Sequence, residues 1–164
     1  MRELEMFFDY ECPYCKKGYE DFLKLLGDYS DISVIWRPCE AHPRPEDHPP
    51  HTELCLQGLF YVQDIGGDVM AYHKRMYDAV HTDKIDVEDA AVLADYVSDM
   101  LDKDAYLAML RDGTYAQVQS QGNDYAYDEC GVWYLPAFRM DGKALDAQGG
   151  IGVSPQQIAE FLKG

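Results

Sequence analysis

Two cysteines separated by two residues, Cys12 and Cys15, are the part of the sequence best suited to chemistry. At the start of a helix, this spacing lets the two sulfurs bond across one turn. The first sulfur then lies beside unpaired backbone amides and the positive end of the helix dipole. Both favour a thiolate, the species that attacks disulfides. Pro13 suits the first helical turn, because its missing N–H costs no hydrogen bond there. The pattern predicts Cys12 as the nucleophile and Cys15 as the more covered thiol that resolves a mixed disulfide.

A pair of cysteines at this spacing also has other uses. It can supply half of a zinc site, or the two side chains can pack as small buried apolar groups. The position expected for Cys12-Pro13-Tyr14-Cys15, between a strand and a helix, favours a redox pair over both.

A second group of candidate metal ligands lies further along, in and after a proline-rich segment: Cys39, His42, His48, His51 and Cys55. Such residues at short spacing can bind zinc, but histidines in a polar loop are usually only solvated. We therefore assign no metal ligand. A zinc site and a second redox pair, Cys39 with Cys55, remain as alternatives. Cys130 is expected to be a buried thiol.

Pro136 stands immediately before a segment predicted to be a strand. Such a proline can mark the end of a loop, or it can be a cis proline, which is rare and usually tied to one position in a fold. Trp133 and Tyr134 lie just before it and are candidates for a substrate-facing surface.

The elements that hold the two cysteines can be predicted on either side of them. Residues 4–8 form a short apolar strand. Residues 19–26 carry apolar side chains at i, i+3, i+4 and i+7, as an amphipathic helix does, and Gly27 is placed to end it. Residues 32–36 form a second strand, closed by Pro38. A strand, a helix and a strand at this spacing predict a right-handed βαβ unit.

The middle of the chain is predicted to be helical. Thr52, Asp68 and Asp86 can each cap the start of a helix, because their side-chain oxygens accept from otherwise unpaired amides. Two shorter helices are expected at about 103–111 and 115–127.

The last part of the chain returns to strands. Residues 137–140 and 143–147 flank Asp141-Gly142, a strong signal for a two-residue hairpin turn. Ser154-Pro155-Gln156-Gln157 then supplies a capping box with proline at the first helical position. The order of elements predicts an α/β fold, βαβ followed by ββα, with a helical insertion between the two halves.

Length and composition limit the kind of protein. The chain has 164 residues, 47% of them hydrophobic, which suits one domain, residues 1–164, with the insertion at about 52–128. The formal net charge of −16, with no run of Lys or Arg, argues against a nucleic-acid partner. The N-terminus is unlike a signal peptide, and no apolar run is long enough to span a membrane. Five cysteines are an odd number, which fits thiols in a reducing compartment better than a disulfide framework. We therefore expect a cytoplasmic protein.

These features together resemble the DsbA-like thioredoxin-fold family, in particular its branch of FrnE-type oxidoreductases and 2-hydroxychromene-2-carboxylate isomerases. The resemblance spans nearly the whole chain. It rests on Phe8-Asp9-x-x-Cys12-Pro13-x-Cys15, the helical insertion, the stretch from Gly131-Val132 to Pro136-x-Phe138, and Asp141-Gly142-Lys143.

The resemblance implies a thioredoxin-like fold and a thiol–disulfide oxidoreductase acting on protein or small-molecule thiols and disulfides. It implies that Pro136 is a cis proline packed against the redox pair, and that the backbone of Leu135 binds substrate. Pro13, Tyr14 and Trp133 complete the expected substrate-binding residues. No prosthetic group is needed, because the electrons reside on the sulfurs, and glutathione can enter as a co-substrate.

The resemblance also leaves alternatives open. The isomerase and kappa-class glutathione transferase branches usually carry serine where Cys12 stands, so this chain fits the oxidoreductase branch better. DsbA-like oxidants tend to have histidine at the position of Tyr14. Family members often bury an acidic proton acceptor below the cysteines, and the sequence does not choose between Asp9 and Glu11. A glutathione-dependent isomerase or transferase, and a non-enzymatic zinc-binding module, remain the rival functions.

Overall fold

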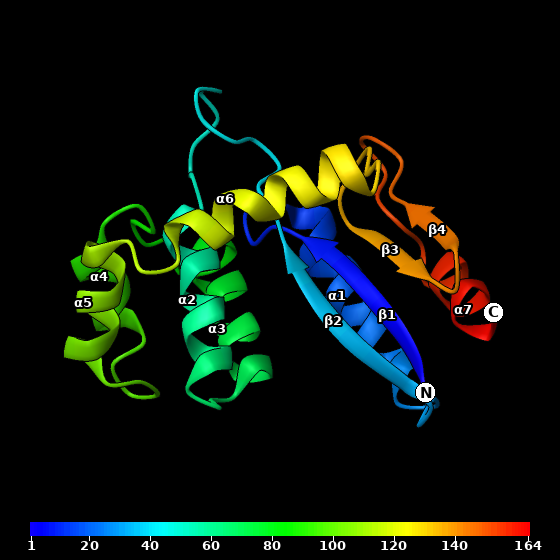
Figure 1. The fold of residues 1–164 in the computed structure, drawn as a ribbon, viewed down its shortest axis with the longest axis horizontal. Coiled ribbons are helices and arrows are strands. Elements are labelled where there is room, and N and C mark those ends of the chain that lie inside the picture. Colours follow the sequence, from blue (N-terminus) through cyan, green and yellow to red (C-terminus); the bar gives the residue numbers. More distant parts are fainter. The chain divides into compact units, whose positions relative to one another are not determined.

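The computed structural model describes all residues, Met1–Gly164, as four strands and seven α-helices (Figure 1). The chain divides into two compact units, residues 1–41 with 122–164 and residues 42–121. The first unit holds the sheet and the second is helical. The second unit begins earlier than the insertion expected at about 52–128, because residues 42–51 already belong to it. It also ends earlier, because residues 122–128 belong to the first unit.

The first unit contains β1 (Arg2–Phe8), α1 (Pro13–Leu26), β2 (Ile32–Pro38), the π-helical turn η1 (Tyr125–Glu129), β3 (Ala137–Met140), β4 (Lys143–Asp146) and α7 (Pro155–Lys163). The strands lie in the order β2-β1-β3-β4. β1 and β2 are parallel, whereas β3 runs antiparallel to both β1 and β4. The predicted thioredoxin-like order, βαβ followed by ββα, is confirmed.

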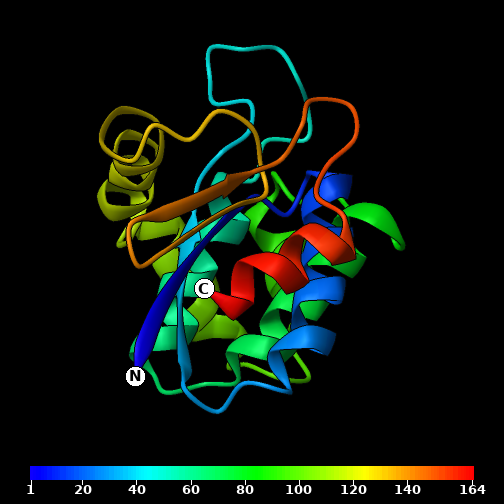
Figure 2. The same ribbon diagram turned by 90° about the vertical axis from the view of Figure 1, so that its right-hand side faces the viewer.

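One face of this sheet is buried beneath α1 and α7, which Figure 2 shows on the same side of the strands. Met6 of β1 lies opposite Phe138 of β3 in the strand pairing. The ring of Phe138 packs 5.4 Å from Phe22 of α1 and 6.2 Å from Phe161 of α7, measured between centroids. Because successive strand residues point to opposite faces, Leu4 points to the same side as Met6, and both are fully buried. This packing fixes the end of β1 relative to the start of α1.

Several element boundaries follow from local side chains, as the sequence predicts. Cys12 is the N-cap of α1, with Pro13 as its first residue. Ser154 and Gln157 form a reciprocal capping box at the start of α7. The Asp141-Gly142 turn has φ values of 53° and 76°, the left-handed pair that a tight hairpin requires.

The helical unit contains α2 (Glu53–Asp64), α3 (Val69–His81), α4 (Ala90–Tyr96), α5 (Lys103–Asp112) and the first residues of α6 (Ala116–Asp124). Its core includes two tyrosine hydroxyls, those of Tyr72 and Tyr106, which lie 2.9 Å apart. The Tyr72 hydroxyl also donates to the Cys55 carbonyl at 2.8 Å. A Cβ at Gly58 would lie 1.9 Å from the Tyr72 hydroxyl, so only glycine fits there.

The start of α4 differs from the prediction. Its N-cap is Asp89, whose carboxylate accepts from the amides of Ala91 and Val92. Asp86, the expected cap, instead accepts from the Glu88 amide in the preceding turn. Two aspartates close together compete for the same role, and the periodicity of the apolar residues does not distinguish them.

Candidate active site

Cys12 and Cys15 face each other across the first turn of α1. Cys12 has extended backbone angles, φ −82° and ψ 117°, and its sulfur accepts from the backbone N–H of Cys15 at 3.3 Å. Cys12 is 8% exposed and Cys15 is fully buried, and both are free thiols. The predicted difference in accessibility between the two sulfurs is therefore present in the geometry.

The surroundings separate the pKa values of the two thiols. The pKa of Cys12 is lowered, first by the hydrogen bond from the Cys15 thiol and then by the backbone amides of Cys15 and Tyr14, against the effect of burial. The pKa of Cys15 is raised well above its ordinary value, mainly by burial and by its hydrogen bond to Cys12. A thiolate therefore forms first at Cys12, the sulfur nearer to solvent.

The segment before β3 lies against this pair. The Cys12 sulfur is 3.8 Å from the Leu135 carbonyl oxygen, to which its thiol donates. The Leu135–Pro136 peptide bond is cis. Pro136 packs on α1 at Gly18, where a Cβ would lie only 2.8 Å from the proline Cγ. Gly18 thus allows the close approach of α1 and the proline, and no pattern in the sequence singled out this glycine.

Four exposed apolar side chains, which we call the apolar rim, lie beside this site, one at the start of α1 and three on two loops: Tyr14, Trp133, Tyr134 and Ile151. Tyr14 rests on Gly152, and Tyr134 rests on Gly149, where a Cβ would meet the tyrosine rings at 3.0 Å and 2.8 Å respectively. Residues 147–153, drawn in dark orange in Figure 2, thereby join the start of α1 to the segment before β3. Ile151 is the member of the rim that the sequence did not single out.

Asp9 lies beneath the cysteines at the end of β1 and is 1% exposed. Its carboxylate accepts from the amides of Ala41 at 2.7 Å and Glu11 at 3.3 Å. Its charge contributes to raising the pKa of two buried thiols, Cys15 and Cys39, although burial is the larger cause for each. Of the two acids considered from the sequence, Asp9 is the buried one.

Cys39 lies near Asp9, whose charge acts on it, rather than in a metal site with the histidines. It follows β2, is fully buried, and its amide donates to the Phe8 carbonyl at 3.0 Å. Cys55 lies in the helical unit and is also a free, buried thiol.

The histidines of the same segment interact locally. The ring of His42 stacks on His48, with centroids 3.6 Å apart, and its Nδ1 lies 2.8 Å from the Glu46 carboxylate. The His51 ring bonds to the Glu46 carbonyl at 2.8 Å. Stacking and carboxylate contacts of this kind are ordinary for histidines in a polar loop.

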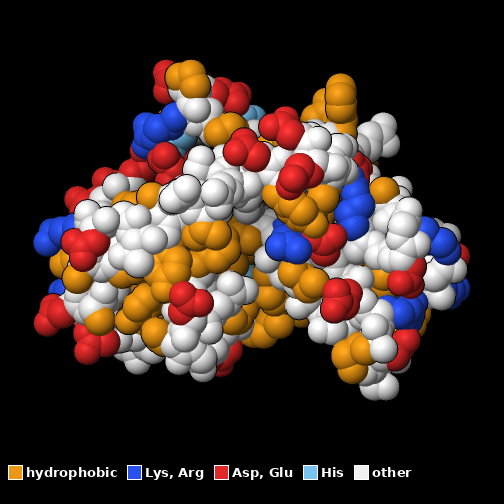
Figure 3. Space-filling model, in the orientation of Figure 1, with side chains coloured by type: hydrophobic (Ala, Val, Ile, Leu, Met, Phe, Trp, Pro, Cys, Tyr) orange, Lys and Arg blue, Asp and Glu red, His pale blue; other side chains and the backbone are white.

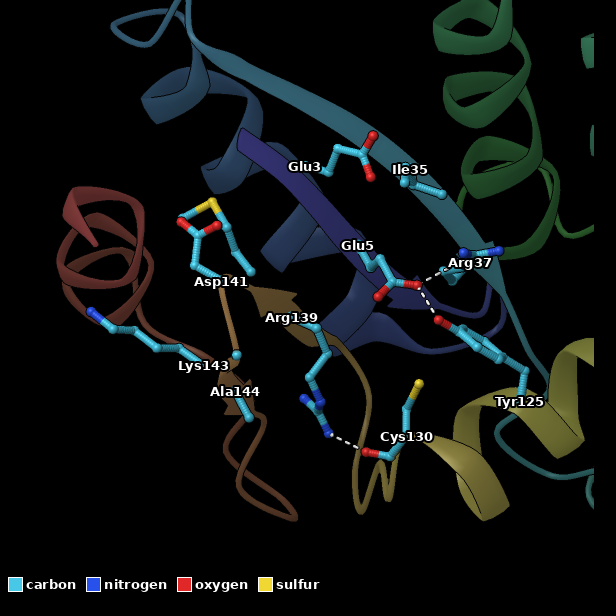
Figure 4. A pocket seen from close by; sticks show the side chains of 12 residues that line it. Glu3, Glu5, Ile35, Arg37, Tyr125, Cys130, Arg139, Asp141, Lys143 and Ala144 are labelled. Atoms are coloured by element: carbon cyan, nitrogen blue, oxygen red, sulfur yellow. Dashed lines mark hydrogen bonds and ion pairs between the residues drawn. The ribbon is translucent and has the colours of Figure 1, made fainter. Parts of the chain in front are cut away.

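Cys130 differs from its expectation, since it is half-buried rather than buried. It ends η1 and lines a surface hollow of about 550 Å³ on the sheet face opposite α1 and α7. Figure 4 shows its thiol pointing toward Glu5, Arg37 and Tyr125, while its carbonyl accepts from Arg139 at 3.2 Å. The hollow carries three basic and three acidic side chains, so its lining has no net charge.

Comparison with known proteins identifies the family. The model of the DSBA-like thioredoxin domain matches residues 3–163. The chain belongs to this family. This DSBA-like chain is also similar to a curated protein, the uncharacterized protein YwbO of Bacillus subtilis (strain 168). The two are 20% identical over 196 residues, which cover 98% of this chain and 97% of the relative.

Solved structures show the same DSBA-like fold. A probable DsbA oxidoreductase of Streptomyces coelicolor is similar with a TM-score of 0.82 and 16% identity, over 99% of this chain and 89% of that one. The cytosolic disulfide reductase DsbM of Pseudomonas aeruginosa is similar with a TM-score of 0.72 and 14% identity, over 98% of this chain and 97% of that one. No helix of this chain has the length and apolar character that crossing a bilayer requires.

Proposed function

We propose that the protein is a thiol–disulfide oxidoreductase in which Cys12 and Cys15 exchange electrons with protein or small-molecule thiols. The opposite pKa directions of two free thiols in one helical turn carry this proposal. Such a pair has one sulfur prepared to attack and a second that is held protonated until it is needed.

The exchange proceeds in two balanced steps. The Cys12 thiolate attacks a substrate disulfide, forms a mixed disulfide with one half, and releases the other half as a thiolate that takes up a proton. Cys15 then loses its proton and attacks the Cys12 sulfur, which releases the second substrate thiolate. The substrate disulfide gains two electrons and the Cys12–Cys15 pair becomes a disulfide. The reverse sequence oxidises a substrate dithiol.

Asp9 is the acceptor we propose for the Cys15 proton. Cys15 is fully buried, so an acceptor within the protein can take its proton faster than solvent base can, and Asp9 is the buried carboxylate whose charge acts on it. Holding a negative charge at Asp9 is made easier by the two amides that donate to its carboxylate.

The Leu135 backbone is the docking point we propose for an extended partner. Its carbonyl lies 3.8 Å from the Cys12 sulfur, and its amide has no partner within the protein. A strand added here brings a partner sulfur to Cys12 through main-chain hydrogen bonds, which need little side-chain specificity. Pro13 and Tyr14, at the exposed start of α1, flank the incoming chain. Glutathione can serve as a small co-substrate by the same steps.

We also propose that the protein works in the cytoplasm. Its cysteines are all free thiols, as expected for a reducing compartment, and it resembles a protein described as a cytosolic disulfide reductase.

Two variants test the exchange directly. Cys15→Ala should accumulate mixed disulfides through Cys12, seen by mass spectrometry without reductant, because the resolving thiol is gone. Cys12→Ala should form none and should not reduce insulin, whereas the control Cys130→Ala should behave as the natural protein. Normal insulin reduction by Cys12→Ala would rule out the proposed mechanism.

A further inference from the structure

Tyr127, on the π-helical turn η1, is a half-buried tyrosine that takes no part in the exchange steps described above. Its hydroxyl donates to the Glu40 carbonyl at 2.6 Å. Four residues earlier, Asn123 binds Glu40 at two further points. It accepts from the Glu40 amide at 2.7 Å and donates to the Glu40 carboxylate at 2.8 Å. Three hydrogen bonds from α6 and η1 therefore fix Glu40, which is 5% exposed.

The carbonyl that Tyr127 binds belongs to the same peptide group as an amide that binds Asp9. The Glu40 carbonyl and the Ala41 N–H are the two polar ends of one planar peptide unit, so fixing one end orients the other. The Ala41 N–H donates to the Asp9 carboxylate at 2.7 Å. A chain of hydrogen bonds thus runs from the Tyr127 hydroxyl through this peptide to Asp9. Bonds in such a chain polarise one another, so the hydroxyl also makes the amide a stronger donor.

The electrostatic surroundings of Asp9 make these amides important. Titratable groups from three elements interact with its charge: Cys15 of α1, Cys39 after β2 and Tyr127 of η1. The pKa of each is raised, with burial as the largest cause, so all three are uncharged near neutral pH and the tyrosine hydroxyl remains a donor. Glu11 and Glu40, whose backbones lie beside Asp9, are acids as well. No positive charge from these groups offsets the burial of Asp9, so its ionised form depends on the amides that donate to it.

We propose that Tyr127 is a positioning residue for the exchange reaction, which orients and polarises the peptide between Glu40 and Ala41 and so keeps Asp9 ionised. This inference rests on the proposed function, in which Asp9 accepts the Cys15 proton. Burial favours a protonated carboxyl, and a protonated Asp9 cannot take up another proton. Tyr127 thus lowers the pH above which Asp9 can act as the acceptor.

Titration of the Asp9 carboxyl carbon tests the hydrogen-bond chain without any reaction. The reduced protein, labelled with ¹³C at its aspartate carboxyls, is followed by NMR from about pH 4 to pH 8, and the Asp9 signal is assigned by its loss in Asp9→Asn. Tyr127→Phe removes only the hydroxyl and should raise the midpoint by about one pH unit, as expected when one amide bond to a carboxylate weakens. Tyr125→Phe is the matched control on the same turn and should leave the midpoint unchanged, because its hydroxyl donates instead to Glu5 at 2.6 Å, in the hollow drawn in Figure 4.

The rate of resolution is the second measurement, made with the symmetrical disulfide of nitrothiobenzoate in a Cys130→Ala background. The Cys12 thiolate attacks this disulfide, keeps one half as a mixed disulfide and releases the other as a coloured anion. Cys15 then loses its proton to Asp9 and attacks the Cys12 sulfur, which releases the second anion and leaves the Cys12–Cys15 disulfide. The rate of the second release should rise with pH through the Asp9 midpoint. Tyr127→Phe should move that rise upward by about the same one pH unit, and Tyr125→Phe should not move it.

The possible failures are distinguishable. If Tyr127→Phe and the natural protein share one Asp9 midpoint, the inference is wrong and the exchange reaction stands. If the midpoint moves while the pH profile of the second release does not, Tyr127 has no role in exchange and Asp9 is not the acceptor. If no second anion is released at any pH, the proposed oxidoreductase function itself is wrong, whatever the NMR midpoints are.

Discussion

Cys12 and Cys15 lie one helical turn apart, yet their surroundings move their pKa values in opposite directions. Near neutral pH, Cys12 should therefore alkylate faster than the other four cysteines, because it alone combines a lowered pKa with contact to solvent. Its alkylation rate should also level off at a lower pH than that of an ordinary thiol. Peptide mapping after brief exposure to iodoacetamide at several pH values measures both, and equal labelling of all five thiols would contradict the assignment.

Asp9 gives a second prediction at the level of one residue. Asp9→Asn should slow the resolution of a Cys12 mixed disulfide on the order of a hundredfold, since a positioned acid–base group contributes about that much. Its resolution rate should also rise about tenfold per pH unit, because solvent base must then remove the Cys15 proton. Stopped-flow decay of a preformed mixed disulfide measures this, with the exposed Asp28→Asn as control. An unchanged rate and pH profile would exclude Asp9 as the acceptor.

The candidate site was only partly predictable from individual residues. The cysteine motif is local in sequence, so its spacing and the following apolar stripe sufficed to place Cys12 and Cys15. The partnership of Asp9 with Cys15 and Cys39 depends on the ends of β1 and β2 meeting, which no local pattern reveals. Ile151 was missed for the same reason, because its loop reaches α1 only through the fold.

At the scale of elements, the approach of α1 to the segment before β3 decides the geometry of exchange. Gly18→Ala would place a Cβ 2.8 Å from Pro136 Cγ, and the rigid ring must then move together with Leu135. We expect insulin reduction to slow on the order of tenfold, since small displacements of reacting groups are costly. Unfolding free energy should fall by about 1–3 kcal/mol.

Gly27→Ala is the matched control on the same helix, because its Cβ would meet only the Lys24 carbonyl at an ordinary 3.7 Å. Activity assays and urea unfolding of both variants make the comparison. Equal activity of Gly18→Ala and Gly27→Ala would show that the contact between α1 and Pro136 does not position the site.

Element boundaries were predictable where one side chain determines them. The local sequence alone was enough to predict two helix starts, at Asp68 and Ser154, and the hairpin turn at Asp141-Gly142. The start of α4 was not predictable, because Asp86 and Asp89 offer equivalent caps. Cys130 was misjudged because the π-helical turn η1, which sets its direction, leaves no signature in the spacing of apolar residues.

At the scale of the whole molecule, the chain carries a large negative charge and divides into two compact units. On the face drawn in Figure 3, Asp and Glu side chains are spread among other residues, with only a few basic ones between them. This agrees with a net charge of −16 and with a surface that repels its own copies. All residues proposed for exchange lie in the unit formed by residues 1–41 and 122–164.

The helical unit carries its own pH sensitivity through His73. Burial lowers the pKa of His73 to about 3, so the folded protein holds it neutral while the unfolded chain protonates it below about pH 6.5. Stability should therefore be complete above pH 6.5 and decrease as the pH falls toward 3. Between pH 7 and 5 the loss due to this group is about 2 kcal/mol.

Urea unfolding at these two pH values checks this prediction. His73→Gln should lose less stability on acidification than the natural protein, whereas the loop variant His42→Gln should lose as much. An identical pH dependence in His73→Gln would show that another group is responsible.

A redox titration of Cys12 and Cys15 tests the central claim most directly. The protein is equilibrated in dithiothreitol or glutathione buffers of defined potential, and the fraction of Cys12–Cys15 disulfide is determined by quenching with acid and mass mapping. We predict one two-electron transition, with a slope of about 30 mV per tenfold change in ratio, between about −270 and −120 mV. It should vanish in Cys12→Ser and Cys15→Ser and persist in Cys130→Ser. Absence of a Cys12–Cys15 disulfide at every potential would contradict the account.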